Sequence, residues 1–377
     1  MIRSHADAGH PSLPAPRRAI AGVQHPSHLD LLVRDVSAPS GPAVDAIVVP
    51  AARDPARLHA AAALAAEIAC PLVVLTSRRA TAAESRAVAA EHGVRPLAVD
   101  IDRQTLPVRL ETHSGPYARP SDTALKRNLA LLLSRMTGWE CVLFLDDDVT
   151  DIDPAELRTA AALIGKYRAV GLENVGYFDN SVVCHANRDT GGEQFCFVGA
   201  GGLLVQAART RSFFPNIYNE DWFFLLEEDG LTEVAMSGHC AQASFDPYED
   251  PARARREEFG DCLAEGMFAL LDDGAQLGEA NHRYWRRFLA QRRRLIEEII
   301  ERARHRPAEP SRRAQILASM NAARDALADV SASLCVAYLD AWRRDQERWA
   351  DYVDRLDTGL GPAEALARLG LAAPEQR

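Results

Sequence analysis

Three consecutive carboxylates, Asp146, Asp147 and Asp148, stand directly after a nearly continuous apolar run at residues 140–145. Adjacent anions repel one another unless a cation joins them. The short apolar run is typical of a strand that is buried on both faces of a parallel sheet. Ligands bind at the carboxyl ends of such strands, and oxygen ligands suit Mg2+ or Mn2+ carrying a diphosphate. The alternative interpretation is an acidic loop or cap before a helix that opens at Pro154.

The segment around the acidic run alternates predicted strands with predicted helices, an order that indicates right-handed βαβ units. The fold class is therefore α/β, with a mostly parallel sheet flanked by helices. A strand-rich part at residues 170–205 and a helical turn at 219–226 follow the last of these units. We predict strands at residues 46–49, 72–75, 96–99 and 140–145, and helices at 57–69, 82–92, 121–136 and 154–167.

Beyond residue 247 the composition shifts to Arg, Glu, Ala and Leu at helical spacing. We predict helices there at residues 251–272, 279–304, 310–330 and 331–356. Arg292, Arg293 and Arg294 are interpreted as a solvated face, opposite an apolar stripe that contains Leu295, Ile299 and Ile300. The chain thus divides into a flexible N-terminal arm at 1–42 with an edge strand near 28–33, an α/β domain at 43–246, and an α-helical C-terminal domain at 247–377.

The composition narrows the kinds of partner that the protein can bind. A net charge of −10 gives no global attraction to nucleic acid or to an anionic membrane, so local groups and a metal must hold any phosphate ligand. The seven cysteines are odd in number and form no C-x-x-C pair, which indicates reduced, buried thiols. The N-terminus lacks the apolar core of a signal peptide, and no stretch reaches the roughly 20 apolar residues of a membrane span. We expect a cytoplasmic protein.

Four local features together resemble the GT-A glycosyltransferases, especially family 2-like enzymes that use nucleotide-diphosphate sugars. The resemblance covers about 200 of the 377 residues. Its features are the end of the first strand at residues 48–53, the basic segment at 126–128, the acidic run, which matches the D-x-D motif, and the acidic pair within residues 219–222. The resemblance implies a GT-A fold and a metal-dependent, inverting transfer of a sugar to a small-molecule or peptide acceptor.

The resemblance also implies roles for particular residues. Asp148 should ligate Mn2+ or Mg2+, with His239 completing the metal site and His185 as a second candidate for that role. Asp146 should reach the ribose or the outer shell of the metal, while Asp147 faces another direction within the donor site. The remaining residues expected to bind the UDP- or GDP-sugar are Pro50, Ala51, Arg53, Lys126, Gly201 and Gly202, with Arg127 as a further phosphate or nucleobase candidate.

An acceptor hydroxyl must lose a proton as it attacks the anomeric carbon, and a carboxylate on the opposite face of the sugar supplies that function. The resemblance assigns the role to Asp221, while Glu220 binds the acceptor or orients the site. A helix N-cap explains residues 219–221 almost as well. The helical tail is compatible with acceptor binding or with homodimer formation.

The sequence departs from the family at residues 76–78, where Thr, Ser and Arg replace the usual acidic residue that reads the nucleobase. The nucleotide therefore stays open. The acceptor is open because the helical tail names none, and the stereochemistry is open because retaining GT-A enzymes share the metal motif.

Three other classes of protein compete with the transferase. Residues 146–150 also fit the D-x-D-x-T signature of haloacid-dehalogenase-like phosphatases, in which Asp146 would be the nucleophile and Asp148 the general acid. That motif normally ends the first strand, whereas three strand–helix units precede it here, and Lys166 is the only lysine after Lys126. Sugar-phosphate nucleotidyltransferases need a glycine-rich loop that residues 50–55 lack. The third class is a non-catalytic nucleotide-sugar-binding module with the helical tail as its interaction surface.

Overall fold

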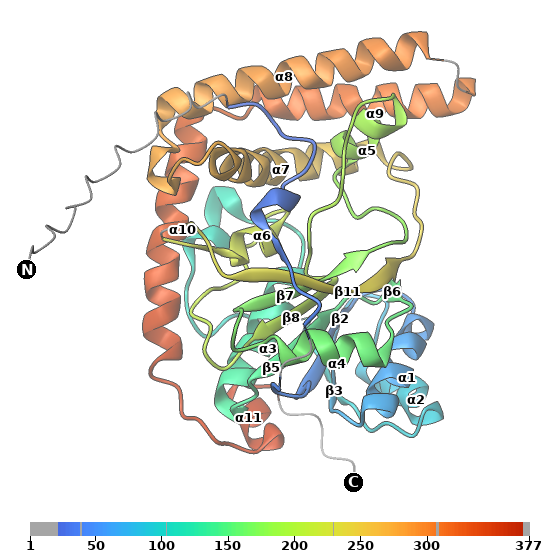
Figure 1. The fold of residues 1–377 in the computed structure, drawn as a ribbon, viewed down its shortest axis with the longest axis vertical. Helices are drawn as coiled ribbons and strands as arrows, with labels where there is room; N and C mark the ends of the chain where they lie inside the picture. The colour runs from blue at the N-terminus through green and yellow to red at the C-terminus, as the bar shows by residue number, and fades with distance from the viewer. Residues whose placement is uncertain (1–21, 38–39, 103, 229, 307–308, 372–377) are drawn as a thin grey trace, which may run out of the picture.

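The computed structural model describes residues 22–37, 40–102, 104–228, 230–306 and 309–371. Its centre is a nine-stranded sheet in the order β1-β11-β7-β8-β5-β2-β3-β4, with β6 paired to β11 (Figure 1). Only β8 and β6 run antiparallel to their neighbours, which confirms the predicted α/β class with a mostly parallel sheet. The strands are β1 Val33–Arg34, β2 Ala46–Ala51, β3 Leu72–Thr76, β4 Leu97–Asp100, β5 Cys141–Leu145, β6 Val149–Thr150, β7 Ala169–Asn174, β8 Gly202–Gln206 and β11 Val234–Gln242, beside a separate hairpin of β9 Leu226–Glu227 and β10 Gly230–Leu231.

Helices cover both faces of the sheet, because successive side chains of its central strands point to opposite sides. In β2, Ile47 and Val49 belong to one apolar core, while Ala46 and Val48 belong to the other. The first core is closed by α1 His59–Ile68, α2 Ala82–Glu91 and α4 Pro154–Ala162, and the second by α3 Thr123–Thr137 and several C-terminal helices.

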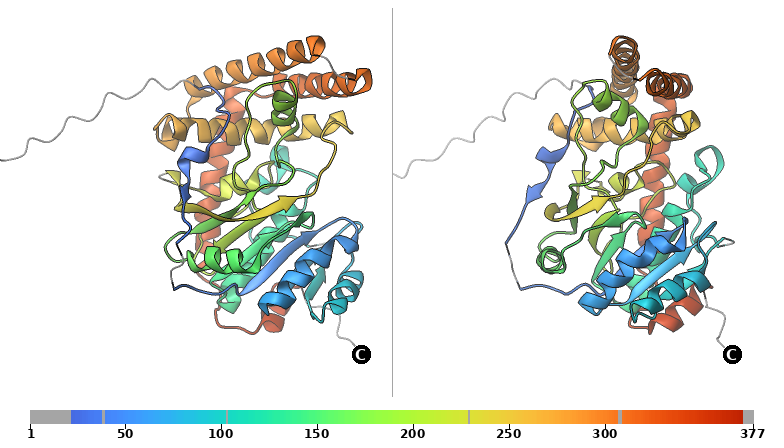
Figure 2. Two further views of the ribbon diagram at one scale, coloured as in Figure 1. Left: turned by 45° about the vertical axis from the view of Figure 1, so that its right-hand side comes forward. Right: turned by 90° about the vertical axis from the view of Figure 1, so that its right-hand side faces the viewer.

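The four helices predicted beyond residue 247 are confirmed, and a further short helix follows them. Three of them, together with α5 Val182–Asp189, enclose a third apolar core above the sheet (Figure 2). The fourth, α10, runs down the side of the molecule, where the ring of Trp342 lies 5.4 Å from that of Phe223. The C-terminal helices therefore share a core with the sheet. Their bounds are α7 Pro251–Asp272, α8 His282–His305, α9 Pro310–Ala328, α10 Ala332–Val353 and α11 Pro362–Arg368.

Three local predictions need correction. Arg292 is wholly buried rather than solvated, although Arg293 and Arg294 are exposed as predicted. The segment at 170–205 contains the helix α5, whose first turn is capped by the side chain of Ser181. The predicted edge strand near 28–33 is a short turn of 3-10 helix, Leu29–Leu31, followed by the two residues of β1.

The predicted N-terminal arm falls partly outside the described residues, at 1–21 and 38–39. From residue 22 its described part lies along α7 and then along the edge of the sheet (Figure 1). Among the described helices, none combines the length and apolarity that crossing a lipid bilayer requires.

The strand order places the acidic run at a point where ligands commonly bind. The chain proceeds from β2 to β3 and β4 on one side, whereas β5 lies on the other side of β2. Crevices outside the carboxyl ends of strands form where the order reverses in this way. Residues 51–53 and 146–148 leave the sheet at this reversal. Because β8 is antiparallel, its amino end brings residues 199–202 to the same edge.

Candidate active site

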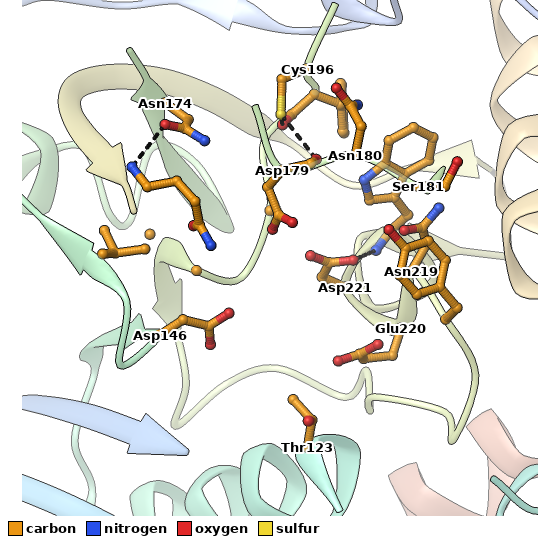
Figure 3. A pocket seen from close by; sticks show the side chains of 18 of the residues that line it. Thr123, Asp146, Asn174, Asp179, Asn180, Ser181, Cys196, Asn219, Glu220 and Asp221 are labelled. Atoms are coloured by element: carbon orange, nitrogen blue, oxygen red, sulfur yellow. Dashed lines mark hydrogen bonds between the residues drawn. The ribbon is translucent and has the colours of Figure 1, made fainter. Parts of the chain in front are cut away.

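A polar cavity of about 230 Å3 opens at this edge of the sheet, between the strand ends and α7 (Figure 3). Its walls come from segments that are far apart in the sequence. The titratable residues among its lining are Arg119, Arg127, Asp146, Asp179, Cys184, Cys196, Tyr218, Glu220, Asp221, Cys240, Asp261 and Glu265.

Arg127 joins the two acidic motifs that the sequence singled out. Its guanidinium lies 2.8 Å from the Oδ1 of Asp146 and 2.7 Å from the Oε1 of Glu220. Burial opposes the charge of Arg127, but the nearby carboxylates of Asp146 and Glu220 hold its pKa above the ordinary value. The structure thus brings together Arg127, Asp146 and the pair at residues 220–221, as predicted.

Asp147 and Asp148 face away from Arg127 and share a different cation. The Nη1 of Arg53 lies 2.7 Å from the Oδ1 of Asp147 and also pairs with Asp148. Burial and the charge of Asp146 raise the pKa of Asp148. Within the described residues, its buried Oδ1 has no hydrogen-bond partner. The charge of Asp146 acts on this carboxylate, and a free carboxylate oxygen in such an acidic run suits a hard divalent cation such as Mn2+ or Mg2+.

The two histidines considered for the metal site lie in other surroundings. The Nδ1 of His239 is 2.9 Å from Glu156 and its Nε2 is 3.8 Å from Glu173, on a half-exposed side chain. The ring of His185 stacks on Tyr177, and burial together with nearby arginines lowers its pKa to about 3. Neither histidine has a contact with the acidic run in the described structure.

Lys126 has an internal role. Its ammonium group donates to the Ala51 carbonyl at 2.8 Å and to the Ser77 hydroxyl at 2.7 Å, and it pairs with Asp122 at 3.2 Å. Burial lowers its pKa against the attraction of Asp122. These bonds hold the ends of β2, β3 and the start of α3 together. Lys126 and Arg127 point to different surroundings, as expected for neighbours on a helix.

Only some of the residues that we expected around a nucleotide line the cavity. Pro50 and Ala51 lie in β2 outside the cavity lining, and Arg53 lies beside Asp147 and Asp148. By contrast, Gly201 and Gly202 line the cavity together with Asp146.

The start of α6 Glu220–Phe224 packs against this glycine segment. Asp221 accepts hydrogen bonds from the backbone N–H of Ala200 at 2.8 Å and of Trp222 at 2.9 Å. A Cβ on Gly199 would lie only 3.0 Å from the Oδ2 of Asp221, so the absence of a side chain lets the two segments approach. Burial raises the pKa of both Glu220 and Asp221.

Sequence reasoning missed Asp179, which lies in the loop between β7 and α5 and points into the cavity (Figure 3). Desolvation by surrounding residues, followed by the charges of Asp146 and Asp221, raises its pKa to about 7. Asp179 is nevertheless an exposed residue, and its carboxylate points into the cavity (Figure 3). No spacing signal in residues 177–181 marks this aspartate.

The far end of the cavity is formed by α7. Potential ligand atoms of Cys184, Asp261 and Glu265 lie within 4.8 Å of one another. Other groups of the protein already bind these ligand atoms. Asp261 accepts a hydrogen bond from the Ser181 hydroxyl at 2.6 Å and lies 2.5 Å from Arg292. Glu265 lies 3.1 Å from the ring of His28. These residues were missed because their partners come from distant parts of the chain.

Comparison with known families and with curated proteins found no match to this chain. The chemistry of the site therefore has to be argued from its own geometry.

Proposed function

We propose that the protein is a metal-dependent glycosyltransferase of the GT-A type, which moves a sugar from a nucleotide-diphosphate donor to an acceptor. The observation that carries the proposal is the buried Oδ1 of Asp148, which has no hydrogen-bond partner among the described residues and lies in the acidic run that follows β5. The position at the strand-order reversal and the polar cavity beside it support the same function.

In this proposal, the acidic run holds the donor's diphosphate end through the cation. Asp148 and Asp146 are the residues that would hold Mn2+ or Mg2+, which when bound offsets the charge that accumulates on the departing diphosphate. Arg127 fixes the orientation of Asp146 through its 2.8 Å contact. Gly201 and Gly202 line the cavity, and a side chain at either position would crowd Asp146 or Cys240, so glycine leaves this wall free for a ligand.

The acceptor side of the proposed reaction is the wall that contains Glu220 and Asp221. Arg127 joins this wall to Asp146, so one cation fixes the spacing between the donor and acceptor sides. Proton removal from the acceptor requires a carboxylate of this region, and the resemblance implies Asp221. A UDP- or GDP-sugar is the expected donor.

Ligand-dependent stabilisation tests the proposal. Melting temperatures would be measured with a panel of UDP- and GDP-sugars, each with and without Mn2+, for the wild type, Asp148→Asn and Asp151→Asn. Asp151 is an exposed acid three residues further along, so the second variant loses the same charge outside the acidic run.

One donor at about 100 times its Kd should stabilise the wild type by about 2.7 kcal/mol. The stabilisation should depend on Mn2+, persist in Asp151→Asn and disappear in Asp148→Asn. If no nucleotide sugar raises the melting temperature, or if Asp148→Asn responds like the wild type, the proposal is wrong.

A further inference from the structure

The carboxylate of Asp179 differs from the other acids of the cavity in its lack of partners. Within the described residues, no side chain or backbone N–H donates to it, and no cation pairs with it. Figure 3 shows it pointing into the same open space as the carboxylates of Asp146 and Asp221. An unpartnered carboxylate can accept a proton from a ligand without first breaking a bond inside the protein.

Asp221 has the opposite arrangement. Each of its two oxygens already accepts a backbone N–H, from Ala200 and from Trp222. Hydrogen bonds of this kind stabilise the anion and so reduce its affinity for a proton. Glu220 is similarly engaged, because its Oε1 lies 2.7 Å from Arg127. The two acids that the sequence marked are therefore well placed to fix geometry.

The loop around Asp179 is anchored on both sides. The thiol of Cys196 donates to the Asp179 carbonyl at 3.3 Å, and the amide of Asn180 donates to the Phe195 carbonyl at 3.3 Å. Arg188 donates to the Asn180 side chain at 3.1 Å. The next residue, Ser181, caps α5 and donates to Asp261. These contacts hold the backbone of Asp179 while its carboxylate stays free.

We propose that Asp179 is the general base that takes the acceptor's proton, and that Asp221 is a positioning residue. This assignment rests on the proposed glycosyl transfer. The acceptor oxygen forms a bond to the anomeric carbon, whose bond to the diphosphate oxygen breaks. The electron pair of the broken bond leaves on the nucleoside diphosphate. The O–H proton of the acceptor passes to the carboxylate of Asp179, and no oxidant or reductant is needed.

The electrostatic surroundings of Asp179 agree with this role. Its pKa of about 7 comes from desolvation and from the nearby charges of Asp146, Asp221 and Asp148. General bases act best when their pKa lies near the working pH, because the anion is then present and still has a useful proton affinity. A divalent cation held by Asp146 and Asp148 would lower this pKa, so the rate with a hydroxyl acceptor should fall as the pH drops below the pKa of Asp179 in the metal-loaded enzyme.

Donor hydrolysis provides a test that needs no known acceptor, because water takes the acceptor's place. Release of nucleoside diphosphate would be measured with the donor that stabilises the wild type, with Mn2+, in the presence and absence of sodium azide. The proteins would be the wild type, Asp179→Asn, Asp179→Glu, Asp221→Asn and the control Asp151→Asn. Azide is an anionic nucleophile that has no proton to lose, so its attack bypasses a general base.

Asp179→Asn should lose at least about 100-fold in hydrolysis, the usual contribution of a general base. It should keep the donor-dependent rise in melting temperature and should recover release with azide, with a glycosyl azide detected by mass spectrometry. Asp179→Glu should recover part of the hydrolysis, and Asp151→Asn should match the wild type. In Asp221→Asn, azide should restore no activity, because the defect there is positional.

Two outcomes would overturn the assignment while leaving the glycosyl transfer intact. The first is wild-type hydrolysis in Asp179→Asn, and the second is rescue by azide in Asp221→Asn but not in Asp179→Asn. By contrast, a wild type that binds no donor, or that binds one and releases nothing with water or azide, would overturn the proposed function and this assignment with it.

Discussion

Two neighbouring groups of acids in this molecule differ in how fully cations pair with them. One group, the α7 cluster, consists of Glu258, Asp261 and Glu265 with the cations Arg292 and His28. Arg292 lies 3.0 Å from Glu258 and 2.5 Å from Asp261, and all three side chains are buried. The other group, the acidic wall, consists of Asp146, Asp179, Glu220 and Asp221. Its partners are one arginine, Arg127, and two backbone amides.

The difference separates structural charge from functional charge. In the α7 cluster the cations stand directly against the carboxylates, so removing one partner leaves a buried charge uncompensated. In the acidic wall, repulsion between the acids is left in place, and the raised pKa of Asp179 records its cost. Asp261 and Glu265 line the same cavity, but their buried cation partners explain them by the fold, whereas Asp179 has a raised pKa without such a partner and is a functional candidate.

The largest expected effect comes from breaking the α7 cluster at Arg292. Arg292→Met should destabilise the protein by about 3–5 kcal/mol, because Glu258 and Asp261 would lose their buried cation. Urea unfolding measures the change. Arg293→Met, at the exposed neighbouring position, should stay within about 0.5 kcal/mol of the wild type. Equal effects of the two substitutions would show that the cluster contributes no special stability.

The pH dependence of stability at His28 provides a second test of the α7 cluster. Burial alone would lower its pKa, but hydrogen bonding to Asp272 at 2.5 Å and to Glu265 at 3.1 Å raises it to about 9. A raised pKa means that the folded state binds the proton more tightly than the unfolded state. Its stabilisation is therefore complete below about pH 6.5 and is lost as the pH rises toward 9.

The shift from 6.5 to about 9 corresponds to about 3 kcal/mol. His28→Gln should thus be less stable than the wild type by about this amount at pH 6, and the difference should shrink by pH 9.5. Chemical denaturation at the two pH values measures it. A difference for His28→Gln that does not change with pH would refute the linkage.

A substitution at Gly199 tests whether the close packing of the acidic wall matters for stability and activity. Gly199→Ala places a Cβ about 3.0 Å from the Oδ2 of Asp221, which must shift and weaken its 2.8 Å bond to Ala200. We expect the free energy of unfolding to fall by about 1 kcal/mol. The rate of donor hydrolysis should fall by a larger fraction of its wild-type value than the free energy of unfolding does. Gly278→Ala is the matched control, because nothing lies within 4 Å of its added Cβ. Full hydrolysis in Gly199→Ala would mean that the position of Asp221 is unimportant.

The smallest effect, and one of opposite sign, is expected at Asp179. A carboxylate whose pKa is raised on folding costs stability as the pH rises from about 4 to 7. Asp179→Asn should therefore be more stable than the wild type at pH 8, by at most about 1 kcal/mol because its side chain reaches water in the cavity. The difference should vanish near pH 4. A variant that is less stable than the wild type at pH 8 would assign Asp179 to the structural group.

Sequence analysis succeeded where the determining signals are local. The apolar run before Asp146 and the alternation of strands and helices fixed the position of the acidic run at a strand's carboxyl end. The apolar stripe of α8 was likewise readable, since Ile299 and Ile300 are buried. Arg292 was misjudged because its partner Glu258 lies 34 residues away on another helix.

Other features depend on contacts that no spacing encodes. Val182 and Val183 favour a strand by propensity, yet they begin α5 because the cap at Ser181 and burial in the third core prevail. The proposed role of Asp179 depends on the convergence of Asp146 and Asp221 in space. The pairing of His28 with Asp272 spans 244 residues and could not be inferred from either segment alone.

That long pairing has a consequence for the way the chain is made. Two of the contacts that hold the described N-terminal segment are made to β11, which pairs with β1, and to α7, whose Asp272 pairs with His28. Both partners leave the ribosome some 200 residues after it. Because domains acquire their structure as the chain emerges, this segment must wait for both of these partners before it can dock fully. Until it docks, residues 235–236 of β11 lack their β1 partner and are open to other strands, so docking also covers this part of the sheet edge against aggregation.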